Sequence, residues 1–164
     1  MCPEHTLGKA HLLGLDLIVH VSSFAALIGI RGSTLTPDSP PTKPPGAYFR
    51  SKADSDLVAR SFQEAGAPVV ITYPGSVWGP HNSHLGESTQ IARNILRGLW
   101  LVTPNRRVPI SDVRDVARLH AAIMQKGQGP RRYICPSHDV SPQEIVNSLA
   151  RTTKRRLTTI AVPP

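Results

Sequence analysis

Two short apolar runs in the first half of the chain predict buried strands. Residues 15–22, LDLIVHVS, and residues 68–73, PVVITY, contain several Val and Ile residues and show no alternation of polar and apolar positions. This pattern is typical of strands that are covered on both faces of a sheet. Between them, residues 48–65 have the length and periodicity of an amphipathic helix. A strand, a helix and a second strand in this order predict a βαβ unit with parallel strands.

The spacing of apolar residues predicts the inner face of that helix, and glycine predicts its end. We expect Leu57, Val58 and Phe62 to form the apolar stripe. Gly66 should end the helix, because glycine adopts the left-handed conformation without strain. A shorter helix over 6–13 is followed by a glycine as well, and we expect it to end in the same way.

The second half of the chain continues the alternation of elements. Its patterns predict helices over 87–99, 111–125 and 145–154, short strands over 108–110, 132–135 and 157–162, and loops over 29–46 and 74–80. Ser111 is the expected N-cap of the second of these helices. Residues 141–144, SPQE, have the composition of a capping box with proline at the first helical position. Strands that alternate with helices indicate an α/β fold.

Length and composition fit one soluble domain. The chain has 164 residues, of which 40% are hydrophobic and 18% are charged. No apolar run is long enough to cross a bilayer, and the start MCPEH lacks the basic and apolar regions of a signal peptide. We therefore expect a cytoplasmic protein without a membrane span.

The net charge of +8 raises the hypothesis of a nucleic-acid partner. The arginines are scattered, however, and only Arg131-Arg132 and residues 154–156, KRR, form clusters. No aromatic residues alternate with these clusters, so a platform for base stacking is not expected. A solvated basic surface without a nucleic-acid partner is the interpretation that we favour.

Cysteines and histidines give no pattern of a metal site. Cys2 and Cys135 have no ligand spacing, and Cys135 is expected to be a small core residue within a strand. His20 and His120 have no carboxylate or second histidine at a suitable interval, so we expect them within or beside the core. No bound metal is predicted.

Tyr48 and Lys52 are the most informative pair for chemistry. They are four residues apart at the start of the predicted helix 48–65, which places both on one helical face. A tyrosine is a poor acid or base at neutral pH unless a nearby cation favours its phenolate, and a lysine one turn along supplies such a charge. Ser23 could hold a substrate oxygen, because it follows a parallel strand, where ligands of open α/β sheets bind.

Five segments in order carry a family resemblance over nearly the whole chain. They are VHVSSFAAL, AYFRSKADSDLVAR, VVITYPGSVWGPHNSHLGES, VPISDVRDVARLHAAIM and RRYICPSHDVSPQEIVNSLARTTKRRL. Their order resembles the extended short-chain dehydrogenase/reductase family, the NAD-dependent epimerase/dehydratase group. Within it, the segments are most similar to the hydroxysteroid dehydrogenase and dihydroflavonol-reductase-like branch.

The resemblance implies a role for each matching residue. Tyr48 would be the catalytic acid/base, Lys52 would stabilise its phenolate and bind the nicotinamide ribose, and Ser23 would polarise the substrate. The cofactor NAD or NADP would contact Ser22, Tyr48, Lys52, Pro74, Gly75, Ser76 and Val77. The substrate pocket would be bordered by Trp78, His81 and His84. The substrate would be a small molecule, expected to be a bulky apolar alcohol or ketone.

The resemblance also implies how the chain is organised. We expect residues 1–164 to form a single partial domain, an incomplete NAD(P)-binding Rossmann fold with part of the small substrate domain. Residues 1–80 would be the second half of the Rossmann sheet, and residues 81–164 would mix its end with substrate-domain elements. An exposed sheet edge would then favour a homo-oligomer or a partner that covers it.

Two departures from the family leave the activity open. Tyr73 stands where relatives commonly have arginine before the Pro-Gly turn. The glycine-rich turn G-x-x-G-x-x-G that cradles the dinucleotide is absent from the sequence, so we expect the first half of the sheet to be missing. The residue that would distinguish NAD from NADP is expected to lie in that half. Two hypotheses follow: hydride transfer on a secondary alcohol or ketone that is impaired by the loss of the glycine-rich half, or an inactive family remnant that serves in binding or assembly or is a decayed reading frame.

Overall fold

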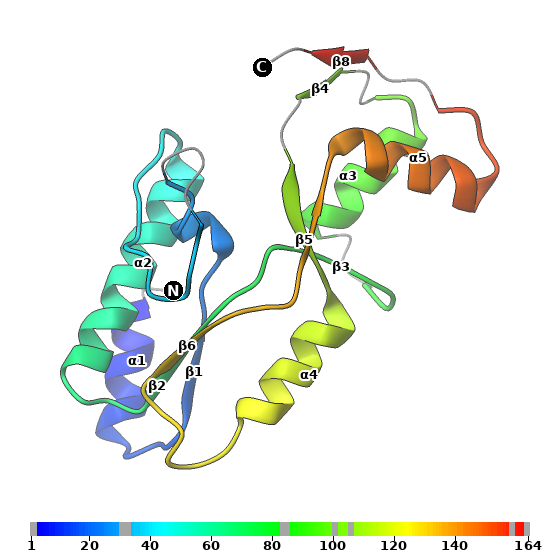
Figure 1. The fold of residues 1–164 in the computed structure, drawn as a ribbon. Helices are drawn as coiled ribbons and strands as arrows, with labels where there is room; N and C mark the ends of the chain where they lie inside the picture. Colours follow the sequence, from blue (N-terminus) through cyan, green and yellow to red (C-terminus); the bar gives the residue numbers. More distant parts are fainter. Residues whose placement is uncertain are drawn as a thin grey trace. The chain divides into compact units, whose positions relative to one another are not determined.

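A computed structural model describes residues 3–29, 34–82, 86–99, 102–104, 107–157 and 160–162. The chain divides into two compact units, each considered by itself. The first comprises Met1–Gly75 and Asp115–Pro136, and the second comprises Ser76–Arg114 and Ser137–Pro164. Helices and strands alternate along the chain, which confirms the α/β class (Figure 1). None of the helices in the described ranges is long and apolar enough to span a bilayer.

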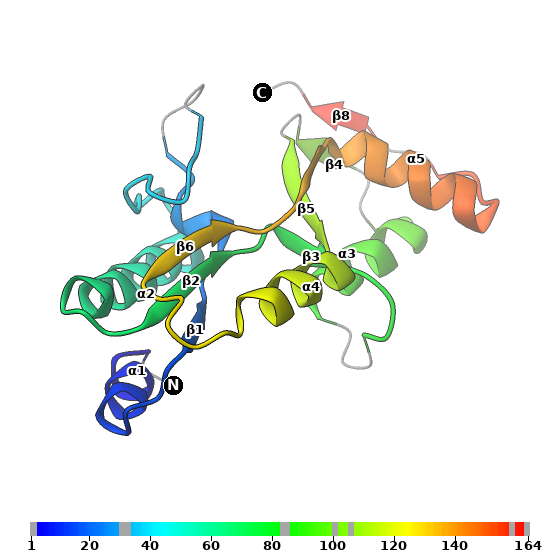
Figure 2. The same ribbon diagram turned by 60° about the horizontal axis from the view of Figure 1, so that its bottom comes forward.

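The first unit contains a three-stranded parallel sheet with the order β1-β2-β6. Its strands are β1 (Ile18–Val21), β2 (Val69–Tyr73) and β6 (Arg131–Ile134). The helix α2 (Ala47–Glu64) connects β1 to β2, and these strands pair in parallel, so the predicted βαβ unit is confirmed (Figure 2). β6 pairs with the other edge of β2 and confirms the strand expected at 132–135.

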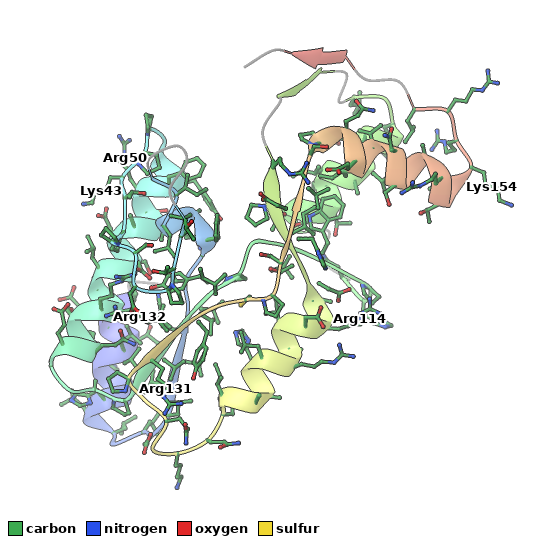
Figure 3. All side chains as sticks on the ribbon, viewed as in Figure 1. Lys43, Arg50, Arg114, Arg131, Arg132 and Lys154 are labelled. Carbon is green, nitrogen blue, oxygen red and sulfur yellow. The ribbon has the colours of Figure 1, made fainter. Side chains whose placement is uncertain are left out.

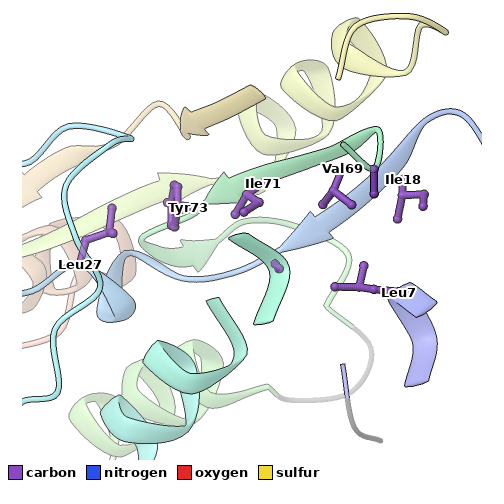
Figure 4. Packing of buried hydrophobic residues seen from close by; sticks show 8 residues of the cluster. Leu7, Ile18, Leu27, Val69, Ile71 and Tyr73 are labelled. Atoms are coloured by element: carbon purple, nitrogen blue, oxygen red, sulfur yellow. The ribbon is translucent and has the colours of Figure 1, made fainter. Parts of the chain in front are cut away.

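The hydrophobic core of this unit lies between the sheet and two helices. Leu7 of α1 (Pro3–Leu12) and Ala59 of α2 pack with sheet residues Ile18, Val69 and Ile71 (Figure 4). Both helices end at a glycine with positive φ, as predicted from the sequence. The amides after each helix return to its last turn, which is the Schellman arrangement. A glycine with positive φ and hydrogen bonds between neighbouring residues therefore end both helices.

The inner face of α2 differs from the predicted apolar stripe. Its buried residues are Ala53, Asp56, Ala59, Arg60 and Gln63, whereas Leu57 is 44% exposed. Val58 and Phe62 are half-buried against the core, so the prediction was right for these two residues and wrong for Leu57. Polar side chains can occupy the buried face because they form hydrogen bonds with one another and with the backbone.

The other face of the first sheet contacts α4 (Val113–Ile123), which starts where the two units meet in the chain. Thr72 is fully buried, and its Oγ1 lies 3.0 Å from Nε2 of His120 on α4. Cys135 follows β6 as a buried free cysteine, as expected, and burial raises the pKa of its thiol to about 11. α4 and α2 thus cover opposite faces of the sheet, since Thr72 alternates with the core residue Ile71.

The second unit contains two small sheets. β3 (Ser76–Trp78) pairs in parallel with β5 (Val108–Asp112), and β5 pairs antiparallel with β7 (His138–Val140). β4 (Val102–Pro104) and β8 (Ile160–Val162) form the other sheet, and the helices are α3 (Glu87–Leu96) and α5 (Pro142–Thr153). β8 was expected within 157–162. β4 and β7 were not predicted.

Two predictions for this unit were wrong. The expected loop 74–80 contains β3, and Ser111 is fully buried within β5 and so is not a helix N-cap. The capping role falls to Asp112, whose Oδ1 accepts the Arg114 amide at 2.8 Å. Parallel pairing of β3 with β5 places both segments in a sheet, which outweighs their local preferences.

Candidate functional site

Ser22 and Ser23 follow the carboxyl end of β1. The Ser22 amide donates to the Thr72 carbonyl at 2.9 Å, and its Oγ is buried without a hydrogen-bond partner among the described residues. The Ser23 hydroxyl accepts the Ala25 amide at 3.2 Å and so caps a short 3-10 helix, Phe24–Ala26. Among the described residues, its proton and second lone pair take part in no other hydrogen bond and are free for a substrate oxygen.

Tyr48 and Lys52 lie together in the first turns of α2. The Lys52 Nζ is 5.6 Å from the centroid of the Tyr48 ring, and the ring is half-exposed. Phe49 packs edge-on against the same ring with centroids 5.7 Å apart. The helix begins after Gly46, whose φ of 119° turns the chain into α2. The spacing predicted from the sequence therefore produces a phenol and an ammonium that face each other.

Pro74 and Gly75 follow β2 at the same end of the sheet. The Pro74 carbonyl accepts the Phe24 amide at 2.9 Å, which ties the segment after β2 to the segment after β1. Ser22 and Ser23 therefore lie next to Pro74 at the carboxyl ends of parallel strands, where ligands of open α/β sheets bind.

The remaining predicted site residues belong to the second unit. Ser76 and Val77 lie in β3 with Trp78, and the Trp78 indole donates to the Ser76 Oγ at 2.9 Å. His81 is exposed and has a positive φ of 65°. His84 lies outside the described residues.

His20 lies beneath α2, two residues before Ser22 on the same strand. Its Nε2 is 3.4 Å from the Ser55 Oγ. Burial lowers the pKa of His20, the carboxylate of Asp56 opposes this shift, and the charge of Lys52 adds to it. The neutral form of the His20 imidazole is therefore favoured. No three His, Cys, Asp or Glu side chains of the described ranges are grouped so that they could hold a metal ion.

A buried polar network, which was not predicted from the sequence, lies beside these residues. The Arg60 Nε donates to Asp56 Oδ2 at 2.8 Å, and the Arg60 Nη2 donates to the Tyr73 hydroxyl at 2.9 Å. The Tyr73 hydroxyl also donates to Asp56 Oδ2 at 3.3 Å, and burial raises its pKa. Tyr73, the departure from the family pattern, is thus a core residue whose hydroxyl is hydrogen-bonded to Arg60 and Asp56. The i, i+4 spacing of Asp56 and Arg60 in the sequence could have indicated this ion pair.

Basic side chains are distributed over many elements, as their positions in the sequence indicated. Figure 3 labels Lys43 and Arg50 around the start of α2, Arg131 and Arg132 on β6, Arg114 on α4 and Lys154 after α5. Several of them are paired with carboxylates, among them Lys43 with Asp54 and Arg132 with Asp38. The net charge is therefore not concentrated on one helix or strand.

Comparison with known proteins decides the family. The profile of the NAD dependent epimerase/dehydratase family matches residues 6–135, most of the chain. The chain belongs to the NAD-dependent epimerase/dehydratase family. A Synechocystis protein that carries the provisional name dihydroflavonol 4-reductase is 31% identical over 158 residues, which are 92% of this chain and 46% of that protein. This confirms the resemblance to the dihydroflavonol-reductase-like branch.

Solved structures of the family share the fold. A dTDP-glucose 4,6-dehydratase from Streptomyces venezuelae, with NAD bound, superimposes with a TM-score of 0.78 at 25% identity. The match covers 98% of this chain and 52% of that one. The NAD complex of UDP-glucose 4-epimerase from Thermus thermophilus gives a TM-score of 0.77 at 21% identity, over 99% and 56% of the two chains. The chain spans about half the length of these relatives and has the Rossmann-like architecture of the family.

Proposed function

We propose that this chain supplies the catalytic residues of an NAD(P)-dependent oxidoreductase that acts on a secondary alcohol or ketone. The observation that carries this proposal is the pairing of Tyr48 and Lys52 at the start of α2, 5.6 Å from ammonium to ring centroid. Ser22 and Ser23 follow β1, at the carboxyl ends of the parallel strands, where ligands of such folds bind.

Each residue has a role that follows from its chemistry. In the oxidation of an alcohol, the Tyr48 oxygen would take the hydroxyl proton, and in the reduction of a ketone it would return a proton. Lys52 would supply a positive charge next to the Tyr48 ring during the proton transfer. The Ser23 hydroxyl, with one lone pair used in its cap, would donate to the substrate oxygen.

The dinucleotide, when bound, supplies the hydride chemistry of this family. The residues at the nicotinamide end fit such a group, because the buried Ser22 Oγ lacks a hydrogen-bond partner among the described residues. Lys52 would bind the ribose, and Pro74, Gly75, Ser76 and Val77 would offer backbone groups. The glycine-rich turn for the pyrophosphate is absent from the sequence.

The substrate that we propose is a bulky apolar alcohol or ketone, bordered by Trp78, His81 and His84. The support is the 31% identity to the dihydroflavonol reductase-like protein, which exceeds the identity to the sugar-nucleotide enzymes. A partner or second copy is proposed to cover β1, which pairs with β2 alone among the described strands. Light scattering of the purified chain would detect such an assembly.

A second function is favoured by the absent glycine-rich turn: an inactive remnant that serves as a binding or assembly protein. Calorimetric titration with NADH and NADPH distinguishes the two. Micromolar binding that is lost in a Tyr48→Phe, Lys52→Ala double variant supports the enzyme. The matched control is Tyr133→Phe, since the Tyr133 hydroxyl forms no hydrogen bond among the described residues. No heat at millimolar dinucleotide would contradict the enzyme and favour the remnant.

A further inference from the structure

The segment between Ser23 and Tyr48 lies along α2 as a strap, which we define as residues 36–43. Its Thr42 amide donates to the Ala26 carbonyl at 2.9 Å, in the turn that Ser23 caps. Its other end leads through Gly46 into the helix that bears Tyr48. The path of the strap therefore connects the two hydroxyl-bearing parts of the proposed site.

Charged side chains attach the strap at three further places. The Lys43 ammonium pairs with Asp54 of α2 at 2.6 Å, and Arg132 of β6 pairs with Asp38 at 3.2 Å. Both pairs include a side chain that is more than half exposed, so each contributes little to stability. The third attachment is the guanidinium of Arg60, whose side chain is only 9% exposed. Arg60 is thus the buried anchor of the strap.

Arg60 reaches three different segments with one planar group. Its Nη2 lies 2.8 Å from the Ser39 carbonyl, 3.3 Å from the Pro37 carbonyl and 2.9 Å from the Tyr73 hydroxyl. Its Nε is bonded to Asp56 one turn earlier on α2. One guanidinium therefore joins the strap, α2 and Tyr73. Tyr73 is the last residue of β2 and directly precedes Pro74.

Stability alone does not explain the buried network of Asp56, Arg60 and Tyr73. Asp56 is fully buried, and its Oδ1 has no hydrogen-bond partner among the described residues. Buried ion pairs often stabilise a fold no more than apolar residues of similar volume, because both charges lose their hydration. What the polar network adds is direction, since hydrogen bonds hold their partners at defined angles and distances. We therefore favour the interpretation that the network fixes the position of the strap over the interpretation that it mainly stabilises the fold.

We propose that Arg60 is a positioning residue of this site: with Asp56 and Tyr73 it couples the strap to the first turn of α2 and to the end of β2. This rests on the proposed function, in which Tyr48 and Lys52 occupy that first turn. Release of the strap would let the start of α2 fray, and the Tyr48 phenol would lose its fixed position in the first turn of that helix.

The test is amide hydrogen exchange on the full chain with two variants. Tyr73→Phe keeps the ring and removes the hydroxyl that bonds Asp56 and Arg60. Arg60→Lys keeps the charge beside Asp56 but lacks the planar fork that reaches the strap. In both, exchange at Ser39, Thr42 and Arg50 should become about tenfold faster, whereas amides of α5 should stay within about twofold.

The matched control is Tyr133→Phe, which removes a phenol hydroxyl from β6 of the same sheet. It should leave the strap amides and Arg50 at wild-type rates. Unchanged exchange in Tyr73→Phe, or faster exchange spread evenly over the whole first unit, would overturn the coupling. Because Tyr73→Phe preserves shape, it decides the matter even where Arg60→Lys does not fold.

Titration with NADH separates this inference from the proposed function. Tyr73→Phe and Arg60→Lys should raise the Kd for NADH about tenfold, or about 1.4 kcal/mol, with no change in the control. Wild-type affinity in a variant with a released strap would overturn the positioning role. A wild-type chain that does not bind NADH overturns the proposed function, while the exchange rates still decide the coupling of strap and helix.

Discussion

The helices α2 and α5 are specified in different ways. In α5, the Ser141 Oγ accepts the Glu144 amide at 3.2 Å, and a Glu144 carboxylate oxygen accepts the Ser141 amide at 2.6 Å. In α2, the N-cap Gly46 provides no side chain, and buried polar residues bond to distant segments. Gln63 is bonded to Arg132, 69 positions along the chain. Residues within one turn define the start of α5, whereas long-range partners define the placement of α2.

The largest effect is expected from removing the buried charge that holds α2. Arg60→Met leaves the Asp56 carboxylate buried without its cation, which should lower the free energy of unfolding by about 3–5 kcal/mol. Urea denaturation measures it. Arg151→Met, an exposed position in the last turn of α5, is the matched control and should stay within about 0.5 kcal/mol. Equal effects of the two variants would show that α2 does not depend on its long-range partners.

A smaller and local effect is expected at the start of α5. Ser141→Ala removes the acceptor for the Glu144 amide and should destabilise α5 by about 1 kcal/mol. Amide exchange in α5 should accelerate, while exchange in α2 stays the same. Ser148→Ala, in the middle of the same helix, should not destabilise it, since alanine has the higher helix propensity. Faster exchange in both helices after Ser141→Ala would contradict a local cap.

The capping box also predicts a pH dependence of α5. The Ser141 backbone and side chain hold the pKa of Glu144 below its ordinary value. The carboxylate therefore stabilises the folded helix above its unfolded pKa of about 4.3, and this contribution is lost as the pH falls through the lower folded pKa. After correction for the intrinsic exchange rate at each pH, the protection of α5 amides in the wild type should fall in that acid range. In Glu144→Gln this dependence should disappear, and its persistence would assign it to another group.

The smallest effect is expected at the exposed attachment of the strap. Lys43→Ala removes the ion pair with Asp54, in which both side chains are more than half exposed, and should cost at most about 1 kcal/mol. Exchange at Thr42 should change less than in Tyr73→Phe. A larger change in Lys43→Ala would move the anchor of the strap from the buried guanidinium to the surface pair.

The same contrast explains which parts of the fold could be predicted. The glycines after α1 and α2 and the capping box of α5 act on neighbouring residues, so their patterns were sufficient. The βαβ unit was predictable because two apolar runs flank one long helix. β3 and the burial of Ser111 were not, since both depend on pairing between segments more than 30 positions apart.

The candidate site divides along the same line. Tyr48 and Lys52 are one helical turn apart, so their proximity followed from the sequence once the helix was predicted. The contact of Phe24 with Pro74 required the parallel alignment of β1 and β2, which the order of elements indicated. The network of Asp56, Arg60 and Tyr73 was missed, because polar residues on a helix are expected to face water.

The sequence by itself determined the family, the α/β alternation, the ends of α1 and α2, the capping box of α5 and the Tyr48–Lys52 pair, because each depends on patterns within short segments of the chain. Only the tertiary structure decided which face of α2 is buried, that Tyr73 is a polar core residue and that Arg60 holds the strap. A buried polar group is tolerated only where a partner satisfies it. Here the partners of Arg60 on the strap and on β2 come from segments that only folding brings together.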